Sequence, residues 1–274
     1  MSARIVGVVL VRNDDLFIER AIRNAARFCD GIHAFDHVST DRTREILRDL
    51  AAEYDHLEVR RVRNVAESHR ALEGYAGTAT WVFGVDGDEL YDPARLATFR
   101  NGLLAGAYDH AFRIASNVLN CVGLDVEKRT ATGYLSPPGR SITKLYNFGA
   151  IESWAGDGSE RLHGGTIVFR PGYDAGSIDN FGESMSWEQT PLRCLHVCFL
   201  RRSSLDPPES SEPSARPNVV ETGMHDLSWR GGLRRLVRGR ARPEVAYKRE
   251  KYMRGDLVNV DASPFLTDEP VRTA

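Results

Sequence analysis

The feature that most constrains the fold is an alternation of two hydrophobic periodicities over the first third of the chain. Ile5–Val11 (IVGVVLV) is a continuous β-branched run, typical of a strand that is buried on both faces. The next segment repeats apolar residues at helical spacing from Ile18 to Phe28. The same alternation then predicts strands at Ile32–Asp36, Leu57–Val62 and Trp81–Val85, a helix carrying Ile46, Leu47, Leu50 and Tyr54, and a helix at Glu67–Thr78.

This β-α-β-α-β-α-β order predicts an α/β protein with a mostly parallel sheet that is covered by helices. Asp14 or Asp15 is expected to cap the first helix, and Ser39-Thr40-Asp41 the second. Ligands of such open sheets bind beyond the carboxyl ends of the strands. The residues that directly follow each strand are therefore the candidates for function.

The later part of the chain is less regular. A helix is expected from Pro93 to about Ala105, followed by a long strand at His110–Cys121. Shorter strands are expected at Lys144–Phe148 and Thr166–Phe169, and Leu192–Leu200 is a further apolar run. The Pro/Ser-rich segment 203–218 is expected to be irregular, either as an inert linker or as a mobile lid.

Composition points to a soluble protein. The start of the chain lacks signal-peptide architecture, and no stretch approaches the ~20 apolar residues that cross a bilayer. The four cysteines form no C-x-x-C pair, so buried free thiols are expected rather than a metal or redox site. We therefore expect a cytoplasmic location.

The strongest local signal is WVFGVDGDELYDP at Trp81–Pro93. An apolar strand delivers Asp86, Asp88 and Glu89 at its carboxyl end, and three carboxylates within four residues repel one another unless a cation or a tight turn compensates. Mg²⁺ and Mn²⁺ prefer oxygen ligands and commonly share them with substrate phosphates. We interpret the motif as a metal–diphosphate site, with an acidic surface turn as the alternative.

A second signal is HAFDHVSTDRT at His33–Thr43. Asp36 ends the second strand, where a carboxylate can accept hydrogen bonds from a nucleobase or ribose. Together, VVLVRNDDLFIERAI, FDHVSTDRT and VDGDELYDP resemble the family 2 glycosyltransferases of GT-A fold, over about residues 4–93 and more loosely to about 200. His37-Val38 departs from the Asp-Gly that is usual in the family.

The resemblance implies an inverting sugar transfer from a nucleoside diphosphate sugar (NDP-sugar), assisted by Mn²⁺ or Mg²⁺. It implies that Asp36 contacts the nucleobase, that Asp86 and Asp88 bracket the metal and the diphosphate, and that Val11 and Asn13 approach the nucleotide. The acceptor, a small molecule, a glycan or a lipid-linked molecule, is not identified by the sequence.

The second half resembles a subgroup in which a K/R-L-Y/F-N motif precedes an acidic pair. KLYNFGAIESWAGDGSERLHGG occupies 144–165, and Glu160 is the first candidate for the base that takes the acceptor proton, with Asp157 next. His196, inside LRCLHVCFLRR, is either a further metal ligand, as in related enzymes, or a core histidine.

A basic segment lies near the C-terminus. Between Trp229 and Arg254 there are ten Lys/Arg and two Glu, so this segment carries a net charge of +8 while the rest of the chain carries −10. By the resemblance, Lys248, Arg249 or Lys251 would neutralise the departing diphosphate alongside the metal. Peripheral contact with the inner face of a membrane is the rival interpretation, and nucleic-acid binding is not expected.

These observations predict a division of the chain: a GT-A catalytic domain at 1–202 (nucleotide-sugar half 1–93, acceptor half 94–202), a linker or lid at 203–220, and a basic, helical C-terminal extension at 221–274. Alternative functions are a sugar nucleotidyltransferase, which would normally carry a Gly-rich loop after the first strand, and a non-catalytic nucleotide-sugar-binding protein. A phosphatase of the haloacid dehalogenase type is disfavoured, because its D-x-D normally lies near the N-terminus.

Overall fold

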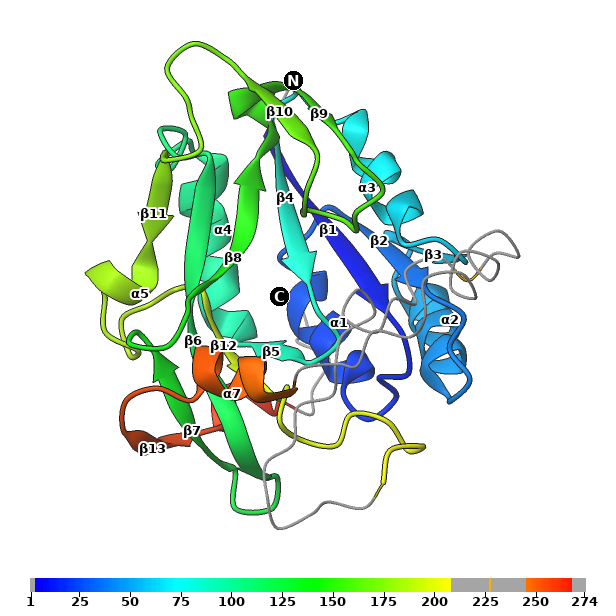
Figure 1. Cartoon of the computed structure of the whole chain (residues 1–274), viewed down its shortest axis with the longest axis vertical. Helices are drawn as coiled ribbons and strands as arrows, with labels where there is room; N and C mark the ends of the chain where they lie inside the picture. Colours follow the sequence, from blue (N-terminus) through cyan, green and yellow to red (C-terminus); the bar gives the residue numbers. More distant parts are fainter. Residues whose placement is uncertain (1–2, 208–226, 228–244, 268–274) are drawn as a thin grey trace.

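The computed structural model describes residues 3–207, 227 and 245–267, and its centre is one large mixed sheet (Figure 1). The strand order is β13-β7-β6-β8-β4-β1-β2-β3, and β4, β1, β2 and β3 are mutually parallel. The predicted α/β class and the four parallel strands of the first third are therefore confirmed. Their bounds are β1 Arg4–Val11, α1 Ile18–Ala26, β2 Gly31–Asp36, α2 Thr43–Glu53, β3 Leu57–Arg61, α3 Ala66–Glu73 and β4 Thr80–Val85.

Both faces of the parallel strands are covered, which explains their continuous apolar runs. Ile5 and Val9 of β1 face a core that includes side chains of α1, α2 and α4 (Pro93–Leu104). Val8 and Leu10 face the opposite core, which α3 and the β9–β10 hairpin close. The four cysteines are buried and free, as expected (Cys29, Cys121, Cys194 and Cys198).

The second half of the sheet is organised around the long strand β6 (Arg113–Asp125). Its first part pairs antiparallel with β8 and parallel with β11, and its second part pairs with β7 and β12. The remaining bounds are β5 Glu89–Tyr91, β7 Thr130–Ser136, β8 Ile142–Asn147, η1 Phe148–Ala150, β9 Ile151–Ala155, β10 Thr166–Phe169, β11 Ile178–Asn180, α5 Phe181–Ser184, β12 Arg193–His196, α7 Val245–Tyr252, β13 Leu257–Asp261 and η2 Ser263–Phe265.

The start of α1 differs from the prediction. Neither Asp14 nor Asp15 caps the helix with its side chain, because Phe17 stands at the N-cap. The backbone carbonyl of Asp14 instead accepts from the amides of Phe17 and Ile18 at 3.2 and 3.0 Å. The Asp14 carboxylate is therefore available for other contacts. In α2 the N-cap is Arg42, which makes no side-chain cap hydrogen bond, so the predicted cap at Ser39-Thr40-Asp41 is one residue too early. Asp41 still accepts a hydrogen bond from the first helical residue, with Thr43 N 2.9 Å from Asp41 Oδ1.

Asp30 holds the turn between α1 and β2 against the sheet. Its Oδ2 accepts from Ile5 N at 2.7 Å, and its carboxylate forms an ion pair with Arg100. Burial alone would raise the pKa of Asp30, but the hydrogen bonds from Arg100 and Ile5 outweigh burial and lower it.

The C-terminal segment joins the same sheet. The predicted helix is present as α7, and the sequence did not predict that β13 pairs antiparallel with β7 at the edge. In Figure 1, α7 lies by β12, β5 and the middle of β6. Most of the predicted linker, and most of the basic segment, lie outside the described residues. In the part of the chain that is described, no helix has the length and apolarity to cross a bilayer.

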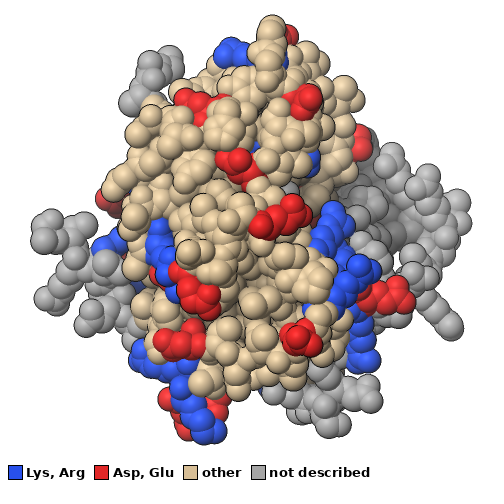
Figure 2. Space-filling model, turned by 90° about the vertical axis from the view of Figure 1, so that its left-hand side faces the viewer, with Lys and Arg blue, Asp and Glu red and all other residues tan. Residues whose placement is uncertain are grey.

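On the face seen in Figure 2, Lys/Arg and Asp/Glu side chains lie close together in mixed groups. Such mixing is ordinary for a protein surface.

Candidate functional site

The residues that follow β1, β2 and β4 meet at one edge of the sheet. Val11 is the register partner of Asp36, and Val9 is that of Val85, so the turn after β4 lies beside the loop after β1. The approach is close: a Cβ added at Gly87 would lie 2.9 Å from Val11 Cγ1 and 3.1 Å from Asp14 Cβ. Glycine between the two aspartates of the D-x-D motif is therefore required by packing.

Asp86 is neutralised by two buried cations of the protein. Lys144 Nζ donates to Asp86 Oδ2 at 2.6 Å, and Arg161 forms an ion pair with Oδ1. Both cations are almost completely buried. Burial by itself would raise the pKa of Asp86, but Arg161 and Lys144 together lower it well below its ordinary value. The two cations thus favour the ionised form of Asp86 at the end of β4.

Glu89 shares Lys144 with Asp86. Lys144 Nζ lies 2.6 Å from Glu89 Oε1, and Tyr91 Oη donates to Glu89 Oε2 at 3.0 Å. Burial raises the pKa of Glu89 to about 8, while Lys144 opposes this shift. The repulsion expected among the three carboxylates is therefore relieved by Lys144, by Arg161 and by the tendency of Glu89 to retain a proton.

Asp88 faces a different pair of groups. Arg202 forms an ion pair with Asp88 Oδ2, and its Nε lies 3.6 Å from Asp14 Oδ1. On the other side, His196 Nε2 lies 3.8 Å from Asp88 Oδ2. The antiparallel pairing of β12 with β5 brings His196 here, because His196 is the register partner of Glu89.

His196 is oriented as a metal-binding histidine would be. Its Nδ1 lies 2.9 Å from Asn120 Oδ1. Asn120 Nδ2 donates to the carbonyls of Tyr134 and Tyr252 at 3.4 and 3.5 Å, which fixes the orientation of the amide. The Asn120 oxygen therefore accepts from His196, and Nδ1 is assigned as the donor. Burial lowers the pKa of His196 to about 4, which keeps the imidazole neutral near pH 7. The lone pair of Nε2 then faces Asp88, with Asn120 as the partner that fixes the ring.

The donor set at Asp88 fits a cation that completes its coordination with phosphate oxygens. Among the described residues, no group of three or more His, Cys, Asp or Glu side chains comes together as a complete metal site. Asp88 and His196 supply an oxygen and a nitrogen, and Mg²⁺-type cations are commonly held by one or two carboxylates together with substrate phosphates and water. In this structure the guanidinium of Arg202 provides the positive charge beside Asp88.

The segment around Arg202 packs against the loops after β1 and β2. Ser203 is fully buried, and its Oγ donates to Asp41 Oδ2 at 2.6 Å. Ser204 N donates to Asp15 Oδ1 at 2.7 Å. These contacts hold Arg202 over Asp88 and Asp14. They also show that the first residues of the predicted linker form part of this edge of the sheet.

The residues predicted for the nucleotide lie at the ends of β1 and β2. Asp36 is completely buried, and its Oδ1 accepts a hydrogen bond from Ser39 N at 2.9 Å. Its Oδ2 has no hydrogen-bond donor within the described residues, and the Nε of Arg61 lies 3.7 Å away from it. Asn13 adopts a positive φ of 56°, and its Oδ1 accepts from Thr40 N at 2.8 Å. Asn13 thus joins the two loops, while Val11 packs in the core.

The two base candidates differ in their surroundings. Glu160 is 14% exposed, and its Oε1 lies 3.2 Å from Arg161 Nη2, so Arg161 links it to Asp86. Asp157 lies on the surface, where a hydrogen bond from Ser159 leads a set that lowers the pKa of Asp157 to about 2. A carboxylate with so low a pKa is a weak base, which argues against Asp157 as the base.

Helix α7 reaches this region through Tyr252, whose ring centroid lies 5.3 Å from that of His196. Arg249 lies one turn earlier on the same helix. The backbone of Lys248 is part of α7, whereas its side chain lies outside what the structure describes.

Sequence reasoning assigned no role to Lys144, Arg161 or Arg202. Lys144 opens the KLYN motif and is one of only four lysines in a chain with thirty-two arginines, a signal that could have singled it out. Arg161 lies beside the predicted base, and Arg202 follows the apolar run of His196. No local pattern marks these two, because only the fold brings them to the carboxylates.

No family description matches the chain, and no curated protein matches it. Among solved structures, it is similar to a mannosyltransferase from Pyrobaculum calidifontis in complex with GDP-Man and Mn²⁺, with 21% identity over 46% of this chain and 37% of that chain, at a TM-score of 0.33. It is also similar to glucosyl-3-phosphoglycerate synthase from Mycobacterium tuberculosis in complex with Mn²⁺, UDP and glucosyl-3-phosphoglycerate, with 19% identity over 42% of this chain and 44% of that chain, at a TM-score of 0.32.

A third similar structure is mannose-6-phosphate isomerase from Helicobacter pylori, with 14% identity over 53% of this chain and 71% of that chain, at a TM-score of 0.34. The chain spans less than half the length of each of the first two proteins.

Proposed function

We propose that the chain is a glycosyltransferase that moves a sugar from a nucleoside diphosphate onto an acceptor hydroxyl with inversion. The observation that carries the proposal is the charge arrangement at the end of β4, where Asp86 and Asp88 stand among the buried cations Lys144, Arg161 and Arg202. Alternating carboxylates and cations at the carboxyl edge of a parallel sheet suit a diphosphate together with a divalent cation.

The proposed metal ligands are Asp88 and His196, with the remaining positions left to the diphosphate and water. Mn²⁺ or Mg²⁺ bound there would supply positive charge to the departing diphosphate. Asp86 acts differently in this proposal: it keeps Lys144 and Arg161 charged and in place beside the same phosphates. These two cations need no reorganisation during the reaction, which is the condition for effective electrostatic stabilisation.

Glu160 is the proposed base. It accepts the proton of the acceptor hydroxyl while the acceptor oxygen forms a bond to the anomeric carbon, and the bond from that carbon to the phosphate oxygen breaks on the opposite face. The bonding electron pair leaves with the nucleoside diphosphate. Arg161 contacts both Glu160 and Asp86, so it orients the base relative to the leaving group.

Asp36 is the proposed partner of the nucleobase. Its Oδ2 is a buried acceptor with no donor among the described residues, and an imide or amino N–H of a base would satisfy it. Because the side chain is fully buried, a base reaches it only when the loop after β2 rearranges.

The test measures nucleotide binding through the stabilisation of the protein against thermal unfolding. UDP, GDP and dTDP are each added with Mn²⁺ or with EDTA to the wild type, to Asp88→Asn and to the control Asp49→Asn, which changes an exposed residue of α2. A selective nucleotide at 100 times its Kd stabilises the fold by about 2.7 kcal/mol. We expect this gain for one nucleotide, only with Mn²⁺, in the wild type and the control.

Full metal-dependent binding by Asp88→Asn would contradict the metal assignment.

The reaction product distinguishes the enzyme classes. A glycosyltransferase releases the nucleoside diphosphate from the donor. A nucleotidyltransferase forms the donor from a nucleoside triphosphate and a sugar phosphate, and it releases pyrophosphate. Tight donor binding without either reaction would favour a binding protein.

A further inference from the structure

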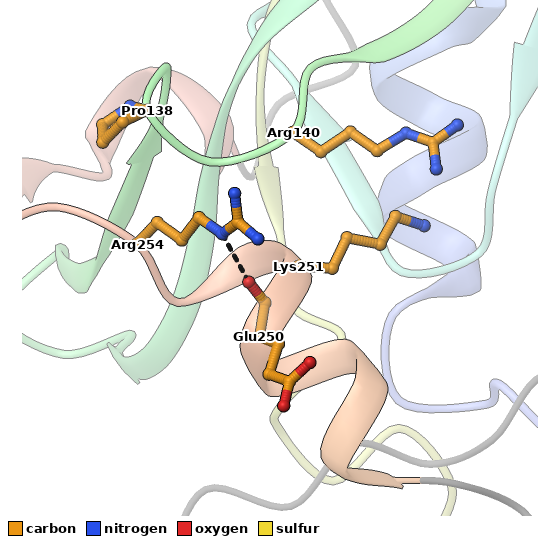
Figure 3. A pocket seen from close by; sticks show the side chains of 5 residues that line it. All are labelled: Pro138, Arg140, Glu250, Lys251 and Arg254. Carbon is orange, nitrogen blue, oxygen red and sulfur yellow. Dashed lines mark hydrogen bonds between the residues drawn. The ribbon is translucent and has the colours of Figure 1, made fainter.

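A hollow of about 290 Å³ lies between α7 and the loop that joins β7 to β8, but its cations share no binding site (Figure 3). The charged ends of Arg140, Lys251 and Arg254 lie apart in Figure 3. Lys251 Nζ lies over the ring of Tyr252, 4.5 Å from its centroid. A different element, α3, packs against β1 and β9 and contacts the proposed transfer site directly (Figure 1).

The contact is made at Arg161, whose backbone conformation is unusual. Its φ is +39°, in the left-handed region that residues with a Cβ rarely adopt. Such a conformation persists only where the surrounding structure holds it, and it is often found at functional sites. The side chain of Arg161 pairs with Asp86 and with Glu160, so the strained residue joins the end of β4 to the proposed base.

Two consecutive residues of α3 hold this backbone on both sides. Ser68 Oγ accepts a hydrogen bond from Arg161 N at 3.0 Å, and His69 Nδ1 lies 2.6 Å from Arg161 O. Because a carbonyl oxygen only accepts, Nδ1 is assigned as the donor. The Ser68 hydroxyl donates to Val65 O at 2.5 Å, which leaves its oxygen as the acceptor for Arg161. Ser68 is 0% exposed and His69 2%, so water does not compete for either contact.

The ring of His69 is itself held in place. Its Nε2 lies 3.2 Å from Trp154 O, and the Trp154 ring packs edge-on against it with the centroids 5.6 Å apart. A Cβ added at Gly156 would lie 2.5 Å from His69 Cδ2, so only glycine lets the chain approach the ring this closely. His69 therefore ties both the end of β9 and Arg161 to α3.

We propose that Ser68 and His69 are positioning residues of the transfer reaction, which act by holding the backbone of Arg161. Glu160 directly precedes Arg161, so a backbone change at Arg161 would displace the proposed base. A displacement of about 1 Å can lower a reaction rate by about a hundredfold. The role in the reaction rests on the proposed function, whereas the hold of α3 on Arg161 does not.

The first experiment measures amide hydrogen exchange over residues 155–165 and needs no substrate. Ser68→Ala removes the acceptor for Arg161 N, and His69→Leu removes the donor to Arg161 O. Each should speed exchange in this segment by about tenfold. His69→Asn places an amide N–H near the position of Nδ1 and should stay closer to the wild type. Arg70→Leu, at the next and exposed position of α3, is the matched control. Unchanged exchange in both Ser68→Ala and His69→Leu overturns the proposal.

The second experiment measures the release of nucleoside diphosphate from UDP-glucose, GDP-mannose and dTDP-glucose with Mn²⁺, with water as the acceptor. Ser68→Ala and His69→Leu should lower kcat by about ten- to a hundredfold while KM for the donor stays within about threefold. His69→Asn should recover most of the rate, and Arg70→Leu should match the wild type. Thermal unfolding checks that each variant is folded at the assay temperature. Ser68→Ala, which removes a single oxygen atom, carries the test if His69→Leu does not fold.

A double-mutant cycle separates positioning from a general structural effect. In a Glu160→Gln background, His69→Leu should lower kcat by less than about threefold, because the base that it displaces is already lost. A full additional loss, or a rate in His69→Leu equal to that of the wild type, overturns the proposal. If the wild type releases no nucleoside diphosphate, the proposed function and the role in transfer both fail, and hydrogen exchange still decides whether α3 holds Arg161.

Discussion

Arg202 supplies the positive charge beside Asp88, so its removal should change the affinity for a metal in a defined direction. The substitution Arg202→Met keeps an unbranched, flexible side chain but removes the guanidinium, and with it the ion pairs with Asp88 and Asp14. Without metal, two almost completely buried carboxylates then lose their cation. Breaking a buried ion pair in this way typically costs about 3–5 kcal/mol, so the variant should be clearly less stable than the wild type in EDTA.

Mn²⁺ should stabilise the Arg202→Met variant, which is the opposite of the destabilisation expected in EDTA. In the wild type, a cation must first displace a guanidinium held by a charge-assisted hydrogen bond of about 1.5–3 kcal/mol. Removing that competitor should raise the affinity for Mn²⁺ in the absence of nucleotide by about ten- to a hundredfold. At a concentration of 100 times the variant's Kd, Mn²⁺ stabilises the variant by about 2.7 kcal/mol, which is roughly 5–10 °C in Tm at this size.

The assay is Mn²⁺ titration by calorimetry together with thermal unfolding in EDTA and in Mn²⁺. Arg201→Met is the matched control, because Arg201 binds the carbonyls of Ser203 and Ser204 and no carboxylate in the part of the chain that is described. Arg202→Lys should fall between the wild type and Arg202→Met. An Arg202→Met protein with unchanged or weaker Mn²⁺ affinity would refute the idea that this guanidinium stands in for the metal.

Three further predictions concern catalysis, stability and acid unfolding. Glu160→Gln should lower the rate of sugar transfer by about 10²–10⁴-fold while its affinity for the donor stays within twofold of the wild type. Asp157→Asn should keep its activity. Loss of donor binding in Glu160→Gln would show that Glu160 belongs to the donor site rather than acting as the base. Lys144→Met should lower the free energy of unfolding by about 3–5 kcal/mol in denaturant titrations. The exposed control Lys128→Met should lose far less, and equal losses would argue against the buried network. Because the pKa of Asp30 is lowered in the folded state, its carboxylate stabilises the fold at pH values above its unfolded pKa near 4, and this stabilisation is lost as the pH falls through the folded pKa. Asp30→Asn should therefore make the free energy of unfolding depend less on pH below pH 4. An acid unfolding transition unchanged from that of the wild type would contradict this assignment.

The sequence predicted the parallel half of the fold well because each element there has a local signature. Ile5–Val11 is apolar throughout since both faces of β1 are covered, and the 3.6-residue spacing of α1 reflects a single buried face. Asp86 and Asp88 also follow β4 directly, as the strand pattern predicted. The sequence did not predict which cations neutralise these aspartates. Arg161 and Arg202 lie far along the chain and contact Asp86 and Asp88 only in the folded sheet.

The C-terminal edge was missed for a related reason. Leu257–Asp261 alternates exposed and only partly buried positions, and its partner β7 lies more than a hundred residues earlier. Such non-local pairing leaves little trace in a single sequence. The same holds for Asn120, whose role beside His196 depends on the register of β6 with β12.

The pairing of β13 with β7 also determines how α7 can move. Only four residues separate the end of the helix at Tyr252 from the first paired residue, Leu257, so its carboxyl end is tethered to the sheet. Any tilt of α7 would therefore pivot about this carboxyl end and would displace Lys251 much less than Val245. A chain shortened before β13 would release this pivot and leave β7 as an open strand edge.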